Sequence, residues 1–147
     1  IELLEATSFL HYALPEKGCL TRRAPDACEY ADIRFGWDVA KELAHLDIGM
    51  TVVVKNKTVL ALEAIEGTDE AIKRGACLGG EGCVVVKTSR PNQDMRFDLP
   101  VVGLSTIETM KNIKSKALAI EAKQTLFFDQ SKAIEEANNS GIAIVAL

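Results

Sequence analysis

The sequence contains no long apolar run, no CxxC cysteine pair and no dense cluster of Lys and Arg. Its longest apolar runs, such as 142–147, are far shorter than the roughly 20 residues that a membrane-spanning helix needs. Four cysteines without CxxC spacing and only two histidines indicate reduced thiols in a cytosolic protein rather than a zinc site. A net charge of −4 makes nucleic acid an unsuitable partner.

The two common nucleotide-binding fingerprints are also missing. Neither GxGxxG nor GxxxxGK[ST] occurs, so the sequence does not indicate a Rossmann or P-loop domain. What is present is a chain of 147 residues, 48% hydrophobic and 26% charged, which is typical of one soluble globular domain. The first residue is Ile1 rather than Met, and we expect the sequence to be a piece of a longer chain.

Strand-like and helix-like segments alternate, which predicts an α/β fold, a single domain with a mixed β-sheet and packed helices. We expect helices at 29–45, from 68 or 69 onward, from 105 onward and at 130–138. We expect strands at 83–87, 117–122 and 142–147, a hairpin over 51–65 that turns at Asn56, and a hairpin partner of 117–122 at 125–129. A short strand and a helical turn are expected within 1–14. Thr68 or Asp69, and Ser105 with Glu108, are the expected helix caps.

The segment 90–100, RPNQDMRFDLP, is the strongest candidate for a reactive site. Asp94 and Asp98 are four residues apart, between two prolines that disfavour a helix. In an extended chain they would project to the same side and could share Mg²⁺, which takes a few protein oxygens and keeps sites for water and phosphate. The alternative is that both are ordinary solvated loop residues.

Cations flank these two carboxylates. Arg96 falls on the same side of an extended chain, and Lys87 and Arg90 come just upstream. Positive side chains beside a metal can neutralise phosphoryl oxygens as charge develops during transfer. The loop is therefore suited to a metal-bound diphosphate.

Two other segments have features of phosphate sites. A helix that starts in EGTD, 66–69, would present backbone N–H groups and a positive dipole end, and Gly67 would permit close approach. The alternative there is a simple helix cap. Arg22 and Arg23 in LTRRAPD could grip a diphosphate, or could belong to a solvated loop. The two histidines lack a Ser or Cys context for covalent catalysis.

Several segments taken together are familiar, namely LTR at 20–22, DI..GWDVAKELAHLDIG at 32–49, VVVK at 52–55, VLALEAIEGTD at 59–69, RPNQDMRFDLPVVG at 90–103 and IEA.QTLFFD at 120–129. In this order and spacing they resemble the C-terminal domain of the LpxI-type UDP-2,3-diacylglucosamine pyrophosphatases. The resemblance covers nearly the whole chain.

The resemblance implies that residues 1–147 are the C-terminal, catalytic domain of a hydrolase of lipid A biosynthesis in Gram-negative bacteria. With Mg²⁺, such enzymes convert UDP-2,3-diacylglucosamine to UMP and 2,3-diacylglucosamine 1-phosphate, and water attacks the sugar-side phosphorus. The substrate lies between this domain and an N-terminal domain absent from this chain, so the isolated fragment should be poorly active. A cytoplasmic location, a peripheral contact with the inner membrane and a homodimer are further expectations.

The same resemblance assigns roles by position. Asp94 and Asp98 are the expected catalytic and metal-binding residues, with the choice of the essential one left open. The expected substrate-binding residues are Glu66, Gly67, Thr68, Asp69, Lys87, Arg90, Gln93, Arg96 and Arg22. Two departures from the family pattern are Arg90, where lysine is frequent, and Lys123-Gln124 in place of a Gly-Lys pair.

A different class of function also fits the sequence. The chain could be a non-catalytic dimerisation or ligand-sensing module attached to a catalytic N-terminal domain, with the apolar strand 142–147 pairing across an interface. Calorimetric titration with Mg²⁺ and UMP separates the two hypotheses, since the module predicts no heat and a tight dimer.

Overall fold

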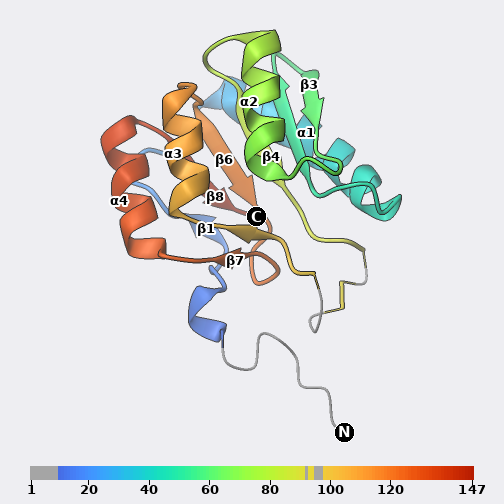
Figure 1. The fold of residues 1–147 in the computed structure, drawn as a ribbon. Coiled ribbons are helices and arrows are strands. Elements are labelled where there is room, and N and C mark those ends of the chain that lie inside the picture. Colours follow the sequence, from blue (N-terminus) through green and yellow to red (C-terminus); the bar gives the residue numbers. More distant parts are fainter. Residues whose placement is uncertain (1–9, 92, 95–97) are drawn as a thin grey trace, which may run out of the picture.

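Residues 10–91, 93–94 and 98–147 are described in the computed structural model (Figure 1). Their helices are α1 (Ala27–His45), α2 (Thr68–Gly79), α3 (Leu104–Asn112) and α4 (Gln130–Ser140), with a short 3-10 turn, η2 (His11–Ala13). Their strands are β1 (Gly18–Cys19), β2 (Thr51–Lys55), β3 (Thr58–Leu62), β4 (Val84–Lys87), β5 (Val101–Val102), β6 (Ala117–Ile120), β7 (Leu126–Phe127) and β8 (Ala143–Ala146).

Six of these strands form one mixed sheet in the order β1-β8-β6-β4-β2-β3. The central strands β4, β6 and β8 are parallel, whereas β2 runs antiparallel to both β3 and β4, and β1 runs antiparallel to β8. Strands β5 and β7 pair in parallel as a separate two-stranded sheet. In Figure 1, β7 lies beyond the lower end of the main sheet.

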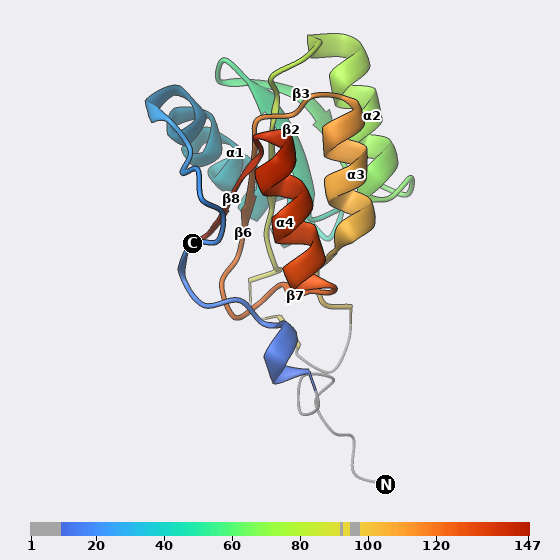
Figure 2. The same cartoon turned by 90° about the vertical axis from the view of Figure 1, so that its left-hand side faces the viewer.

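Helices cover both faces of the main sheet. In Figure 2 the sheet is seen between α1 on one side and α2, α3 and α4 on the other. Because both faces are buried, the central strands are continuous apolar runs instead of alternating polar and apolar residues. In β4, Val85 packs toward α2, α3 and α4, while Val84 and Val86 pack toward α1.

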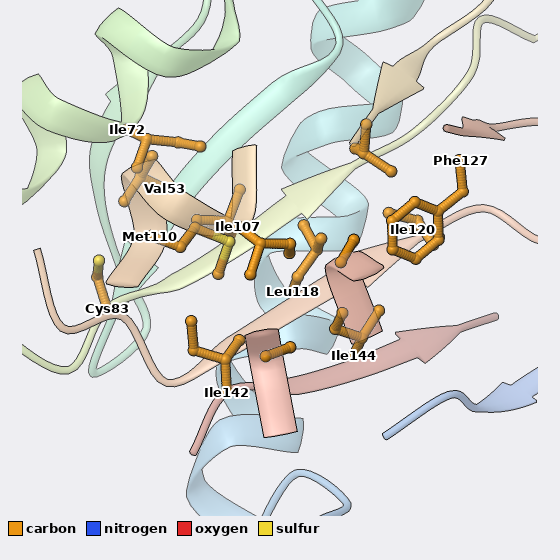
Figure 3. Packing of buried hydrophobic residues seen from close by; sticks show 14 of the residues in the cluster. Val53, Ile72, Cys83, Ile107, Met110, Leu118, Ile120, Phe127, Ile142 and Ile144 are labelled. Carbon is orange, nitrogen blue, oxygen red and sulfur yellow. The ribbon is translucent and has the colours of Figure 1, made fainter. Parts of the chain in front are cut away.

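The larger side chains gather on the face of the three helices. Figure 3 shows Leu118 and Ile120 of β6 and Ile144 of β8 packed with Ile107 and Met110 of α3. On the other face, small residues of β6 and β8 (Ala117, Ala119 and Ala143) meet α1. There Gly36 approaches Val86 so closely that an added Cβ would lie 2.9 Å from Val86 Cγ2. The difference in side-chain size sets how near each helix layer lies to the sheet.

Most of the predicted elements are confirmed. The structure has the expected α/β domain with a mixed sheet, the four helices and the strands at β4, β6 and β8. The hairpin β2–β3 turns at Asn56 and Lys57, both with positive φ (51° and 54°), and Asp32 of α1 accepts both of their backbone N–H groups at 2.9 and 2.7 Å. The start of the chain, residues 1–9, lies outside the described residues.

Four local predictions are wrong. Neither Thr68 nor Asp69 caps α2 and no Ser105 box caps α3, because each helix begins one residue after a glycine, Gly67 and Gly103, without a side-chain cap. The segment 125–129 does not form a hairpin with β6, since β7 pairs with β5 in parallel. Strand β8 lies between β6 and β1, so it is not the edge strand that the dimerisation hypothesis requires.

Candidate functional site

The two segments predicted to carry chemistry meet at one edge of the sheet. The loop 90–100 follows β4, and the turn 66–69 follows β3, whose direction matches that of β4 because both are antiparallel to β2. Strand β6, parallel to β4, ends at the same edge. In open α/β sheets, ligands bind outside the carboxyl ends of parallel strands. The candidate site therefore lies where this rule places it.

The base of the acidic loop is held by Glu121, the residue after β6. Its Oε2 accepts the backbone N–H and the hydroxyl of Ser89, each at 2.7 Å. Lys41 of α1 places its Nζ 2.7 Å from both carboxylate oxygens and 3.3 Å from the Ser89 carbonyl. One carboxylate thus joins β6, α1 and the start of the loop.

Further along the loop, Arg90 links two aspartates. Its Nε donates to Asp47 Oδ1 at 2.5 Å and its Nη1 lies 2.7 Å from Asp98 Oδ2. The hydrogen bond to Asp98, followed by that to Asp47, raises the pKa of Arg90 above its ordinary value. Gln93 accepts the Arg90 backbone N–H at 3.2 Å and donates to the Asp98 carbonyl at 3.3 Å. These contacts bring Arg90, Gln93 and Asp98 close together.

Both candidate metal ligands are exposed residues. Asp94 is exposed, and the side chain of Asp98 is 63% exposed with one oxygen held by Arg90. Asp98 has a φ of 48°, so the expectation of a continuous extended chain fails at that residue. Arg96 lies outside the described residues. Among residues 10–91, 93–94 and 98–147, no group of three or more His, Cys, Asp or Glu side chains is placed to hold a metal.

The turn 66–69 is built around Gly67, which has a φ of 85° that suits glycine and no other residue well. Glu66 is paired with Arg74, which lowers the pKa of Glu66, and its other oxygen accepts the Ala64 N–H at 3.0 Å. Thr68 donates its hydroxyl proton to Glu63 Oε1 at 2.9 Å. No side chain caps the N-terminus of α2.

A pocket of about 560 Å³ opens beside this turn. It is lined by the N-terminal residues of two helices, Thr68 and Asp69 of α2 and Leu104 and Ser105 of α3, and by Asp129 before α4. None of these three helices has a side-chain hydrogen bond at its N-cap, whereas α1 has a complete capping box. Uncapped helix N-termini present backbone N–H donors and a partial positive charge, which suit a phosphate group.

Lys87 is the last residue of β4. It is only 4% exposed and is not among the residues that line the pocket. Its Nζ lies 2.5 Å from Thr68 Oγ1, 3.2 Å from Thr51 Oγ1 and 3.8 Å from Glu63 Oε2. Burial lowers the pKa of Lys87 below its ordinary value, against the opposite effect of Glu63.

Arg22 is not brought to this edge. Its backbone N–H donates to Asn138 near the end of α4, and the neighbouring Arg23 bonds to the carbonyls of Lys116 and Gly141, at the start of β6 and before β8. Both arginines therefore lie at the opposite edge of the sheet. Lys123, at one departure from the family pattern, pairs with Glu16 at 3.1 Å.

The sequence reading missed three polar residues at the site: Lys41, Glu63 and Glu121. Lys41 lies within the predicted helix 29–45 and Glu63 within the predicted hairpin 51–65, and neither position indicated a site residue. Glu121 carried a usable signal, because it directly follows a buried parallel strand, where site residues gather in α/β sheets.

The chain matches the family model of the LpxI C-terminal domain over residues 16–145, and it belongs to this family. It is similar to the UDP-2,3-diacylglucosamine pyrophosphatase LpxI of Caulobacter vibrioides, with 33% identity over 139 residues. The match covers 89% of this chain and 50% of the relative, so the chain spans about half the length of that protein.

Proposed function

We propose that this chain supplies the diphosphate-binding and catalytic half of a UDP-2,3-diacylglucosamine diphosphatase in lipid A biosynthesis. Water would attack the sugar-side phosphorus, the bond from that phosphorus to the bridging oxygen would break, and UMP and 2,3-diacylglucosamine 1-phosphate would leave. Membership of the LpxI family and the similarity to the UDP-2,3-diacylglucosamine pyrophosphatase of Caulobacter support this reaction. The other partner in the site is the N-terminal domain of the longer protein.

The observation that carries the proposal is the meeting of an anion site with an acidic loop at one sheet edge. The pocket at the N-termini of α2 and α3 offers backbone N–H groups, with Gly67 and Gly103 at the two caps. Donors fixed before the reaction stabilise charge on phosphoryl oxygens without reorganisation. The loop with Asp94, Asp98 and Arg90 leaves strand β4 at the same edge of the sheet at which β3 leads into α2.

The donor set is consistent with Mg²⁺ when the substrate completes the coordination. Mg²⁺ is commonly held by one or two carboxylates plus phosphate oxygens and water, and Asp98 keeps most of its carboxylate exposed. Asp94 and Asp98 would hold the ion, which would neutralise charge on the diphosphate. Either of these two aspartates could also accept the proton of the attacking water.

Arg90 would act on the same charge from the protein side. It is held by Asp47 and Asp98 and keeps its guanidinium charge at every physiological pH, which its raised pKa reinforces. As negative charge moves onto the leaving UMP, a fixed cation beside the loop lowers the free energy of the transition state. Arg90 therefore serves both to order the loop and to balance its charge.

A diacylated substrate also needs an apolar environment, and the site edge offers one. Large apolar side chains are exposed there: Tyr12, Leu46, Ile48, Ile65, Val101 and Phe128. Val101 and Phe128 also line the pocket at α2 and α3. No helix in the described part of the chain is long and apolar enough to span a membrane. A peripheral contact with the cytoplasmic face of the inner membrane would let these residues meet the acyl chains.

The test is release of UMP by the full-length protein with and without Mg²⁺. We expect activity that EDTA abolishes and Mg²⁺ restores, and a loss of roughly 100-fold or more in kcat for Asp94→Asn, Asp98→Asn or both. Asp38→Asn, at an exposed position on α1, is the matched control and should keep full turnover. Wild-type turnover in both loop variants would remove the acidic loop from the reaction.

A further inference from the structure

The ammonium group of Lys87 is buried beneath the turn that leads into α2. With 4% of the residue exposed, it is one of the least accessible charges of the described chain. A buried ammonium is costly unless it is paired and hydrogen-bonded. Here it is stabilised by the hydroxyls of Thr68 and Thr51 and by the Glu63 carboxylate 3.8 Å away.

These contacts use the single proton of the Thr68 hydroxyl and one of its two lone pairs. Its oxygen accepts from Lys87 Nζ at 2.5 Å and its single proton goes to Glu63 Oε1 at 2.9 Å. A hydroxyl has one proton to donate, so Thr68 has none left to donate to a ligand. As the first residue of α2, it also does not occupy the N-cap position. Gly67, at the N-cap, has no side chain to cap the helix either. The first residue of α2 is therefore bonded to Lys87 and Glu63 beneath the turn, while no side chain caps the helix N-terminus on the side of the pocket.

Lys87 also lies between the two halves of the site. The carboxylates of Glu63, Asp69 and Asp98 all act on its charge, and they oppose the effect of burial on its pKa. Asp69 belongs to the first turn of α2, and Asp98 to the acidic loop. Thr68 and Asp69 line the pocket, whereas Lys87 does not.

We propose that Lys87 is a positioning residue: through Thr68 it fixes the turn 66–69 so that the first N–H groups of α2 face the diphosphate, without touching the substrate itself. This inference rests on the proposed function. It differs from a direct phosphate contact by Lys87 in one measurable respect. If Lys87 acts only through Thr68, removal of both side chains should cost no more than removal of either one.

The test compares Lys87→Met, Thr68→Val and the double variant in the full-length protein, with UDP-2,3-diacylglucosamine as substrate. We expect each single variant to lower kcat/KM by roughly 10- to 100-fold, as loss of a supporting hydrogen bond does around metal sites. The kcat/KM of the double variant should be within about threefold of that of the less active single variant. Thr68→Ser keeps the hydroxyl and should recover most of the turnover lost in Thr68→Val.

A matched control lies at the end of strand β2, next to β4 in the sheet. Lys55 Nζ donates to the Gly79 carbonyl at 2.7 Å, so Lys55→Met removes a lysine that bonds to the other end of α2. This variant should keep kcat/KM, and the thermal midpoints of both lysine variants show whether loss of stability accounts for loss of rate. If Lys87→Met does not fold, Thr68→Val against Thr68→Ser still tests the hydroxyl.

The outcomes separate the two proposals. Additive losses in the double variant would mean that Lys87 acts independently of Thr68. Unchanged turnover in Lys87→Met or in Thr68→Val would mean that the turn is positioned by other groups. Either result overturns the inference while the active wild-type protein preserves the proposed function. An inactive wild-type protein would remove the proposed function, and the inference with it.

Discussion

Glu121 accepts hydrogen bonds from both donors of Ser89, the backbone N–H and the hydroxyl, with its Oε2 2.7 Å from each. Ser89 is the second residue after β4, and Glu121 is the first after β6, so the contact crosses two adjacent parallel strands. Lys41, a residue of α1, forms an ion pair with the Glu121 carboxylate. The direction in which the acidic loop leaves the sheet is therefore fixed by one side chain.

Glu121→Ala should destabilise the protein and slow the reaction. The change leaves the Ser89 N–H and the Lys41 ammonium without their acceptor, and hydrogen bonds to charged groups contribute about 1.5–3 kcal/mol each to stability. We expect the free energy of unfolding to fall by about that amount, and kcat of the full-length protein to fall as the loop loses its fixed start. Urea unfolding and UMP release measure the two effects.

Glu136→Ala serves as the comparison, because Glu136 pairs with Lys111 at the same distance of 2.7 Å, between α4 and α3, and both side chains are more exposed (28% and 53%) than those of Glu121 and Lys41 (18% and 30%). An exposed pair contributes little to stability, so this variant should leave both turnover and the unfolding midpoint nearly unchanged. Equal kcat values in the two variants would show that Glu121 has no special effect on the loop.

Two glycines of α2 predict opposite responses to alanine. At Gly75 an added Cβ would lie 2.7 Å from Val53 Cγ1 and 2.8 Å from Val53 Cβ, atoms of a rigid, buried side chain on strand β2. Gly75→Ala should therefore cost about 1–3 kcal/mol of stability, as overpacking of a core does.

At Gly79 the nearest atoms are the ends of the flexible Leu60 side chain. Leu60 can change rotamer, and alanine favours a helix over glycine by up to about 1 kcal/mol. Gly79→Ala should thus be neutral or slightly stabilising in thermal melts. A larger loss in Gly79→Ala than in Gly75→Ala would contradict the close packing of α2 on β2.

The elements that the sequence predicted well are those whose signal is local. The buried runs at β4, β6 and β8 are apolar because both faces of the sheet are covered, and Asn56 marked a turn that needs positive φ. Helix starts were less predictable. Thr68 has the residue type of a cap, yet its hydroxyl is used by Lys87 and Glu63, two residues that no local pattern relates to it.

The site was predictable in outline and not in its supporting contacts. The loop 90–100 and the turn 66–69 carried visible charge and glycine patterns, and they do meet at one edge of the sheet. The pair Lys41–Glu121 joins residues 80 positions apart, and Arg22 was expected at the site although β1 carries the chain toward the opposite edge. Such contacts depend on strand order, which the sequence alone did not supply.

The hairpin turn between β2 and β3 offers a stabilising substitution. Lys57 adopts a φ of 54°, a conformation that costs a side chain roughly 1 kcal/mol and glycine almost nothing. Asn-Gly is the preferred pair in such turns, so Lys57→Gly should raise the free energy of unfolding by up to about 1 kcal/mol. Lys57→Ala, which keeps the strain, is the control and should give no such gain in urea unfolding.

The buried thiol of Cys83 predicts a selective chemical response. Cys19, Cys28 and Cys77 are exposed, whereas Cys83 is buried and lies 3.0 Å from Ser115 Oγ. Burial raises the pKa of Cys83 above its ordinary value of 9.0, so little thiolate forms at pH 8. Alkylation of the native protein at pH 8 should modify the three exposed cysteines, and Cys83 only after unfolding, as mass spectrometry of the peptides would reveal.

The raised pKa of Cys83 also predicts how the free energy of unfolding changes with pH. Above pH 9 the unfolded chain loses the Cys83 proton while the native state keeps it, so unfolding releases a proton and becomes more favourable as pH rises toward the folded pKa. Cys83→Ala should remove this part of the decline, although the variant is less stable at neutral pH because it leaves a small cavity. Cys77→Ala, at an exposed position, should keep the wild-type slope. Identical slopes for Cys83→Ala and the wild type between pH 9 and 10.5 would mean that the thiol titrates alike in both states, contrary to its burial.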